Sequence, residues 1–295
     1  MSPAPSALGR AVPLLRCPNC GAGMSSSTSG VVCNSGHSFD RARQGHLTVL
    51  GGRGRRFPGD TADQVASRDR VLGSGLFDPV ADALGEAGRE GVGDAPGPVV
   101  LDVGAGTGFY LGRQLDGLTR DGARPPLGIG TELSAAAARR LARAHPHAAA
   151  LVADTWDGLP LADRAVDLLQ AVFAPRNPAE FARVLPPGAT LVVALPGAGH
   201  LEPLRSRAGM LTPAVDKAVR LTAELAGAFT PAGRRDVDVT SRIPASLAAD
   251  LAVMGPSGVH LDRHELAHGL GDAEHPVRVH VEVCAFRRTG EPLHE

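Results

Sequence analysis

A glycine-rich turn between an apolar strand and a helix constrains the fold of this chain more than any other feature. Residues 98–111 read PVVLDVGAGTGFYL, in which an apolar run over 99–103 includes Asp102 and leads into the turn Gly104-Ala-Gly106-Thr-Gly108. Glycines at this spacing let the backbone approach a ligand closely, and the first N–H groups of the following helix have no partners within it. The segment therefore predicts the opening strand, loop and helix of an α/β cofactor-binding domain.

The spacing of the glycines separates two classes of cofactor. A nicotinamide or flavin fold would use Gly-x-Gly-x-x-Gly, with a pyrophosphate at the helix N-terminus. Here the pattern is Gly-x-Gly-x-Gly preceded by an acid, which is typical of S-adenosylmethionine sites. We expect Asp102, Gly104, Gly106 and Gly108 to meet the amino acid end of that cofactor.

Two further acids end the next two predicted strands. Glu132 closes the strand in PLGIGTELSAAAARRLARAHP (126–146), about two dozen residues past the glycine loop, where it would accept both ribose hydroxyls. Asp154 closes the strand in HAAALVADTWDGLPLADRAVDLL (147–169), where it would accept from the adenine amino group. Acids in this order after successive strands strengthen the S-adenosylmethionine hypothesis.

Strands and helices alternate through residue 197, which predicts a parallel sheet covered on both faces. The segments 236–243 and 276–286 read as strands, and valines alternate with other residues in the second of them. An antiparallel ending of this kind completes a Rossmann-like, seven-stranded class I methyltransferase sheet. Helical stretches at 201–229 and 244–270 are expected around the substrate entrance.

Near its start the chain carries a cluster of metal-binding residue types. Cys17 and Cys20 are two residues apart, Cys33 and His37 three apart, and twelve residues separate the pairs. Each pair fits a tight turn, and a Cys₃His set is a known structural zinc arrangement with no open position for chemistry. A set of buried, reduced cysteines is the alternative, but the polar residues around the pairs make a poor core. The predicted zinc supplies folding energy to a segment too short to build a core alone.

The placement of charge and cysteine suggests a partner and a compartment. The chain has a net charge of −1, but residues 1–70 hold nine arginines against four aspartates, so this segment carries +5 and the remaining 225 residues −6. The basic segment predicts contacts to RNA phosphates from Arg41, Arg43, Arg53, Arg55 and Arg56, unless the excess is merely solvated. Four cysteines, no signal peptide and no apolar run long enough for a membrane span predict a cytoplasmic protein without membrane contact.

These features predict three parts of the chain. Residues 1–50 form a zinc-binding, RNA-recognition domain, 51–60 a Gly/Arg linker, and 61–295 an S-adenosylmethionine-dependent methyltransferase domain.

Several short motifs occur in the order seen in one known family. They are the zinc set, Phe39-Asp40 with Ala42 and Gly45, Gly59-Asp60, GLFDPV, FAPRNPAEFARVLPPG and MGPSGVH (254–260). From about residue 14 to 287 the chain resembles the RlmA family of 23S ribosomal RNA (guanine-N1)-methyltransferases. It is nearest to the actinobacterial branch that includes the tylosin-resistance methyltransferase.

The resemblance implies an acceptor, a reaction and further site residues. Family members methylate N1 of a guanine in a 23S rRNA hairpin loop beside the peptide exit tunnel, where a methyl group can block macrolides. The family's cofactor contacts map onto Phe77, Gly106, Thr107 and His200. The loop that begins at Phe173 is expected to line the target-base pocket, with Phe173 itself also at the cofactor. The implied partner is 23S rRNA or its precursor, and a homodimer is left open.

The sequence departs from the family pattern at two aromatic positions. His46 follows Gly45 where the family usually has tyrosine, and Phe77 replaces the tyrosine on the cofactor side. Fewer aromatics to stack a splayed base leave RNA specificity open. Two rivals to rRNA methylation therefore remain: a small-molecule methyltransferase of natural-product metabolism, and a catalytically silent protein that holds RNA or a partner.

The sequence also leaves the catalytic base open. Guanine N1 carries a proton at neutral pH, so methyl transfer needs a base or a stabilised guanine anion. The candidates near the predicted pocket are Asp154, Asp157, His200 and His260.

Overall fold

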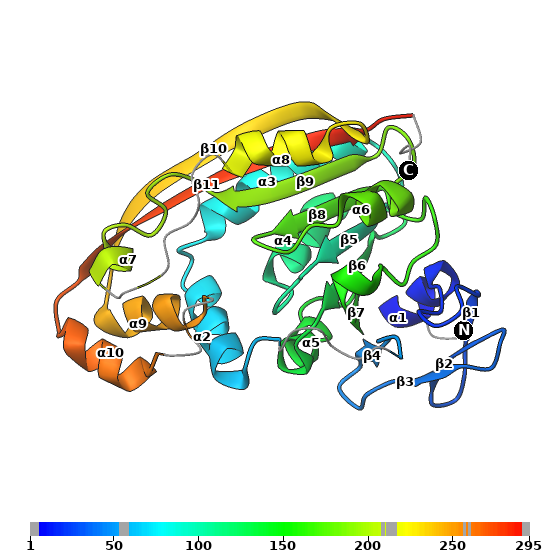
Figure 1. Cartoon of the computed structure of the whole chain (residues 1–295), viewed down its shortest axis with the longest axis horizontal. Coiled ribbons are helices and arrows are strands. Elements are labelled where there is room, and N and C mark those ends of the chain that lie inside the picture. Colours follow the sequence, from blue (N-terminus) through cyan, green and yellow to red (C-terminus); the bar gives the residue numbers. More distant parts are fainter. Residues whose placement is uncertain are drawn as a thin grey trace.

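An eight-stranded sheet runs through the molecule and carries helices on both faces (Figure 1). It is seen in a computed structural model that describes residues 6–52, 59–207, 210, 217–255, 258 and 261–290. The strand order is β10-β11-β9-β8-β5-β6-β7-β4. Within these described residues, no helix is both long and apolar enough to cross a membrane.

Five parallel strands form the centre of the sheet. They are β5 (Val99–Val103), β6 (Leu127–Glu132), β7 (Ala148–Val152), β8 (Leu168–Val172) and β9 (Thr190–Pro196). The helical connections are α4 (Phe109–Leu118), α5 (Ala135–Leu141), the short η2 (Thr155–Asp157) and α6 (Pro178–Val184). The predicted alternation of strands and helices is confirmed, and the glycine turn lies between β5 and α4.

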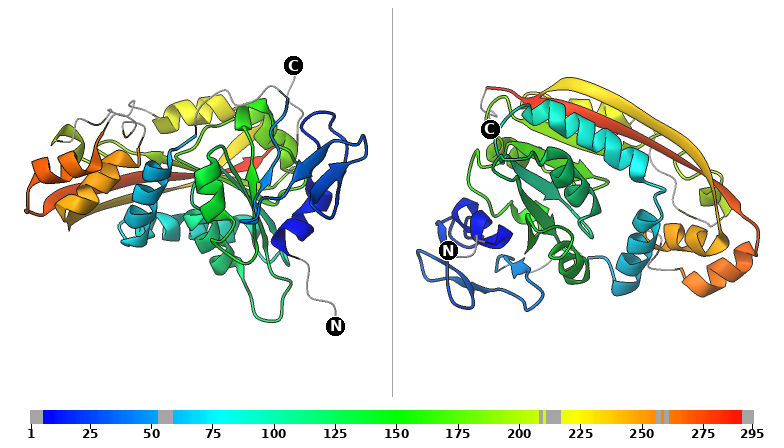
Figure 2. Two further views of the ribbon diagram at one scale, coloured as in Figure 1. Left: turned by 90° about the horizontal axis from the view of Figure 1, so that it is seen from below. Right: turned by 180° about the vertical axis from the view of Figure 1, so that it is seen from behind.

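Side chains alternate between two hydrophobic layers along each central strand. Val100 packs into the layer that contains α3 (Asp78–Val92) and α4, whereas its neighbour Leu101 packs into the layer that contains α1 (Ala7–Ala11) and α6. The views from two sides show α3 and α8 (Lys217–Leu225) on opposite faces of β9 and β11 (His275–Arg288) (Figures 1 and 2). The central strands are buried on both faces, which explains why their sequences read as continuous apolar runs.

The last two helices before β5 and the glycine loop are α2 (Ala62–Gly73) and α3 (Asp78–Val92). Thr61 caps α2 with a reciprocal pair of hydrogen bonds: its hydroxyl accepts from the Gln64 N–H, and its own N–H donates to the Gln64 side chain. This capping box fixes where α2 starts, and therefore which of its side chains face the site described below.

A long antiparallel pair ends the chain. It consists of β10 (Phe229–Ile243) and β11 (His275–Arg288), and β11 pairs with β9 only over residues 281–287. The half of this pair that extends past β9 carries α9 (Ala245–Val253), which packs against α2, and α10 (Arg263–Leu270), which packs against α9 (Figure 1). Two helices, α7 (Leu204–Arg207) and α8 (Lys217–Leu225), lie between β9 and β10 in the chain. The predicted antiparallel ending is confirmed.

The first fifty residues contribute to the main sheet as well as to a small one. After α1 (Ala7–Ala11) and η1 (Val12–Leu14), an antiparallel sheet forms from β1 (Met24–Ser26), β2 (Gly30–Cys33) and β3 (Ser38–Asp40). We call residues 17–46 the ribbon. The chain then returns along β7, where β4 (Leu47–Thr48) pairs in parallel as an eighth strand beside the predicted seven. The division at residues 50 and 60 stays a prediction, and the structure adds that both ends of the ribbon are joined to the methyltransferase fold.

Candidate cofactor and zinc sites

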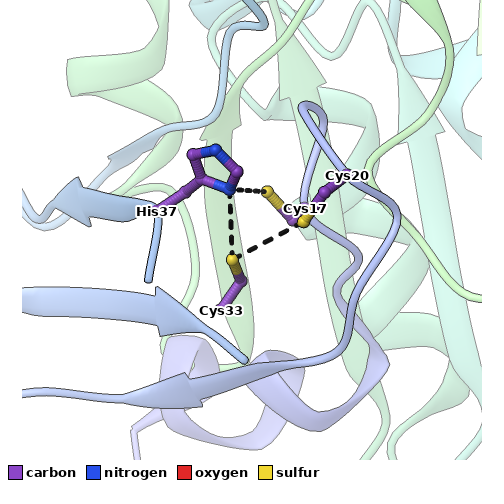
Figure 3. Close-up of side chains that lie close together, drawn as sticks. All are labelled: Cys17, Cys20, Cys33 and His37. Atoms are coloured by element: carbon purple, nitrogen blue, oxygen red, sulfur yellow. Dashed lines mark hydrogen bonds between the residues drawn. The ribbon is translucent and has the colours of Figure 1, made fainter. Parts of the chain in front are cut away.

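Four ligand atoms converge at one end of the ribbon (Figure 3). Those of Cys17, Cys20, Cys33 and His37 all lie within 4.8 Å of one another. Tight turns bring each pair together, because Gly21 N–H donates to the Cys17 carbonyl and Gly36 N–H to the Cys33 carbonyl. The structure thus assembles every predicted metal residue.

The distances within this cluster fit a tetrahedral zinc ion. His37 Nδ1 lies 3.6 Å from Cys17 Sγ and 3.4 Å from Cys33 Sγ, and the sulfurs of Cys20 and Cys33 are 3.7 Å apart. Zinc bonds of about 2.3 Å to sulfur and 2.0–2.1 Å to nitrogen give tetrahedron edges of roughly 3.5–3.8 Å. Zinc is therefore a structural cofactor here, with four protein ligands and no position left for a substrate.

The glycine loop brings the start of α4 close to two neighbouring loops. Gly104 has a φ of +68°, and a Cβ there would lie 2.7 Å from the Cβ of Ala174, in the loop after β8. Gly108 caps α4 with a φ of +86° and packs on Leu141 at the end of α5. No side chain among the described residues caps α4, whose first two residues line the cavity described below, so its first N–H groups remain available to a ligand.

The three predicted acids occupy distinct positions around this loop. Glu132 bridges it to the next turn: one oxygen accepts from Gly106 N–H and the other from Ser134 N–H, each at 2.8 Å. Asp102 and Asp154 are buried, and each has one carboxylate oxygen with no hydrogen-bond partner among the described residues. Burial raises the pKa of Asp102 to about 7. The two unpartnered oxygens fit the donors that S-adenosylmethionine offers, its ammonium and its adenine amino group.

Glu132 supplies a test of the cofactor site. We expect Glu132→Ala to weaken the binding of S-adenosylmethionine and S-adenosylhomocysteine alike by about 10- to 100-fold, because the side chain predicted to accept both ribose hydroxyls is lost. Calorimetry with both ligands measures this. Glu86→Ala, on the outer side of α3, is the matched control and should bind both normally. Wild-type affinity in Glu132→Ala would remove this residue from the cofactor site.

A cavity of about 730 Å³ opens beside the glycine loop. Five of the predicted cofactor residues, Phe77, Asp102, Thr107, Phe173 and His200, line it together with the backbone of Gly104 and Gly106. The ring centroids of Phe77 and Phe173 are 6.4 Å apart and edge-to-face, and His200 lies 6.3 and 5.8 Å from them. Glu132 and Asp154 do not line this cavity.

The hydrogen bonding of His200 determines what its ring can do. His280 N–H donates to His200 Nδ1 at 3.3 Å, so in the neutral ring the proton is on Nε2. Burial lowers the pKa of His200 to about 4, which keeps the ring neutral at physiological pH. This arrangement favours His200 as a hydrogen-bond donor to the cofactor or the target base rather than as the catalytic base.

Of the remaining predicted base and RNA-binding residues, some are described and do not line the cavity, and the others lie outside the described residues. Asp157 lines a second hollow of about 510 Å³, against Arg16, Cys17 and Pro18. Arg41 and Arg43 are exposed on the ribbon. His260, Arg53, Arg55 and Arg56 lie outside the described residues. All of these roles stay predictions.

Sequence reasoning missed two kinds of cavity residue. Asp60 and Arg68 form an ion pair in the cavity wall, and Arg68 also donates to the Met254 carbonyl at 2.9 Å. The capping box at Thr61 could have pointed to them, because it fixes the register of α2. Cationic side chains also line the cavity, and we call them the cationic rim: Arg176, Arg205, Lys217 and Arg220. Arg176 pairs with Glu224, which also lines the cavity, and Arg205 pairs with Glu202, so Lys217 and Arg220 contribute most of the net positive charge of this rim.

A buried carboxylate connects the helices of the far cavity wall. Asp250 on α9 accepts from Arg70 on α2 at 2.6 and 2.8 Å, from Arg263 on α10 at 2.5 and 3.1 Å, and from the Ser67 hydroxyl at 3.0 Å. Burial by itself would raise the pKa of Asp250, but the hydrogen bonds from the two arginines hold it at about 2. Asp250 therefore joins α2, α9 and α10 into one unit.

Comparison with known proteins gives one close set of relatives. A family model described as the N-terminal region of RlmA, a zinc ribbon, matches residues 15–52. A Streptomyces fradiae protein named 23S rRNA (guanine(748)-N(1))-methyltransferase is 39% identical over 258 residues, which cover 88% of this chain and 90% of that protein. A Micromonospora griseorubida protein with the same type of name is 39% identical over 292 residues, 94% of this chain and 97% of that one. Among solved structures, an Aquifex aeolicus SAM-dependent methyltransferase is 16% identical with a TM-score of 0.45, covering 77% of this chain and 99% of that one.

Proposed function

The chain belongs to the family of the 23S rRNA (guanine-N1)-methyltransferases and is an S-adenosylmethionine-dependent enzyme, and from this premise we propose that it methylates N1 of a guanine in a 23S rRNA hairpin loop. The observation that carries the proposal is the 39% identity to the Streptomyces fradiae protein over 88% of this chain. The cationic rim adds support, because RNA offers phosphates to a cavity that also holds a cofactor loop. The proposal includes action in the cytoplasm and, finer still, protection against macrolides of the tylosin type.

The residues around the cavity explain how the reaction is arranged. Bound S-adenosylmethionine supplies a sulfonium-linked methyl group, which is a strong electrophile. The glycine loop and Asp102 would hold the amino acid end of the cofactor and Asp154 its adenine amino group, and the loop after β8 would form the wall where the target base enters. Methyl transfer then depends mainly on holding guanine N1 in line with the methyl group.

Methyl transfer also requires removal of the guanine N1 proton. For this step, the described residues of the cavity offer groups that stabilise the guanine anion, and none of them is assigned as the base. A neutral His200 with its proton on Nε2 can donate to the guanine O6 and stabilise the anion that forms when N1 gives its proton to a solvent water molecule. The cationic rim acts in the same direction, because positive charge beside the cavity favours an anionic guanine. Asp154, another of the four base candidates, is a buried carboxylate that does not line the cavity, so its role as the base stays a prediction.

Methylation of 23S rRNA fragments with mass mapping of the product tests the acceptor directly. We expect one methyl group on N1 of one guanine, and weaker RNA binding as salt rises, with each phosphate contact adding about 0.7–0.9 to the slope of log K against log salt. Replacing Arg53, Arg55 and Arg56 together by Ala should lower that slope and leave S-adenosylmethionine binding intact.

A second triple variant controls for the loss of charge. Its three arginines are paired with acids elsewhere on the surface: Arg113 with Asp82, Arg120 with Asp94 and Arg242 with Glu274. This variant should keep the wild-type salt slope. Cofactor binding without methylated RNA, and equal slopes for all three proteins, would point to a small-molecule acceptor. Absence of transfer to either kind of acceptor would favour a silent binding protein.

A further inference from the structure

Large apolar side chains are exposed at few places in the part of the chain that the structure describes. The chain has one tryptophan, and aromatic residues make up 3% of it. Among the described residues, the exposed large hydrophobic side chains are Trp156, Phe173 and Val219. They belong to η2, to the loop after β8 and to α8, and the last two of these elements line the cofactor cavity. Exposure of a tryptophan forfeits the favourable burial of a large apolar surface, so its position calls for an explanation.

Hydrogen bonds on both sides fix the backbone that carries Trp156. Its N–H donates to Asp154 Oδ1 at 3.0 Å, and Asn177 Nδ2 donates to the carbonyl of Thr155 at 3.2 Å. Asn177 also caps α6 by accepting from the Glu180 N–H at 3.3 Å. Trp156 is 48% exposed. Its backbone lies in a turn that hydrogen bonds hold in place, one of them from the loop after β8.

Phe173 is presented on that same loop by an unusual backbone conformation. Its φ is +53°, in the left-handed region that favours glycine, and its N–H donates to the Ala194 carbonyl at 3.1 Å. The ring contacts Phe77 and His200 in the cavity, yet the residue is 42% exposed. Strained, non-glycine residues of this kind cluster at functional sites.

Positive charge shares the cavity lining with Phe173, and the residue after Trp156 faces the ribbon across a second hollow. Arg176 follows Phe173 in the loop, and Lys217 and Arg220 on α8 belong to the same cavity lining. Next to Trp156 in the chain, Asp157 lines the hollow that faces the ribbon. Exposed rings beside cations are the features with which proteins bind single-stranded nucleic acid, by stacking bases and attracting phosphates.

We propose that Trp156 and Phe173 each stack a base of the RNA strand that runs from the ribbon to the cavity. Phe173, in the cavity wall, takes the target guanine, and Trp156 takes a nearby base of the same loop. This inference rests on the proposed function. Its main competitor places Trp156 against the cofactor, because the neighbouring Asp154 is a predicted adenine contact.

Affinities for RNA and for the cofactor separate these two roles. With a 23S rRNA hairpin fragment at constant salt, Trp156→Ala should bind RNA about 5- to 150-fold more weakly, the range expected for loss of one base–aromatic stack. Its affinity for S-adenosylmethionine should stay at the wild-type value. Trp156→Phe keeps a stacking face and should recover most of the RNA affinity, and Val219→Ala removes an exposed apolar group that cannot stack and should have no effect.

The single tryptophan also gives a direct signal. RNA added to enzyme saturated with S-adenosylmethionine should quench the fluorescence of Trp156. Weaker cofactor binding with unchanged RNA binding in Trp156→Ala would place the ring on the cofactor and overturn the proposal. So would wild-type affinity for both ligands. Methylation by the wild-type enzyme in the same assay reports on the proposed function separately, so that function can hold while the stacking role fails.

Discussion

A Cys33→Ser variant is expected to lose the zinc ion and, with it, the folded ribbon. Cys33 Sγ lies within 3.7 Å of both His37 Nδ1 and Cys20 Sγ, so the substitution removes one of the four zinc ligands from between two others. Structural zinc contributes about 10–16 kcal/mol to small domains, far more than the few buried side chains of the ribbon can replace. Metal analysis should show roughly one equivalent of zinc in the wild type and almost none in the variant.

The change should remain local, because both ends of the ribbon are anchored to the methyltransferase fold. Leu15 bridges to Leu161 on one side, and Leu47 pairs with Leu151 on the other. Hydrogen exchange should therefore become fast over residues 17–46 and stay slow in β5 to β9. Cys284→Ser is the matched control: this buried cysteine of β11 lies outside the cluster, and the variant should keep its zinc. Full zinc retention in Cys33→Ser would falsify the ligand assignment.

Local patterns predicted the sites that depend on parallel strands or on short spacings. Asp102, Glu132 and Asp154 each lie at the end of a strand, and the carboxyl ends of parallel strands meet at one edge of the sheet. The zinc set needs only two tight turns. The positions of these residues in the fold were therefore predictable from the sequence without knowledge of distant contacts, and the roles of the three acids at the cofactor stay predictions.

Features that depend on distant contacts were not predictable in this way. The strand β4 has two residues and no readable periodicity, so its pairing with β7 gave no signal. The tautomer of His200 is set by the N–H of His280, 80 residues away. Asp250 reads in the sequence as one acid in an apolar helix, and its partner Arg70 is 180 residues distant.

Asp250→Asn is expected to destabilise the protein by about 2–3 kcal/mol at neutral pH, because removing one charge of a buried ion pair leaves its partners uncompensated. Arg70 and Arg263 are partly exposed, so water recovers part of the loss and the lower end of the usual range applies. Urea unfolding of wild type and variant measures the difference. The matched control is Asp238→Asn, which removes an exposed carboxylate paired with Arg278 and should cost well under 1 kcal/mol.

The pH dependence gives this prediction its sharpest form. The pKa of Asp250 is about 2 in the folded protein and near 3.8 when the side chain is free, so the carboxylate stabilises the folded state above pH 4. As pH falls from about 4 toward 2, the wild type takes up a proton at this site on unfolding and loses that advantage, whereas Asn has no proton to bind. The difference in unfolding free energy between the two proteins should therefore be constant from pH 8 to pH 5 and shrink below pH 4. Because zinc loss at low pH affects both proteins equally, it cancels in the difference. A gap that does not change with pH would mean that packing, rather than the charge of Asp250, holds α2, α9 and α10 together.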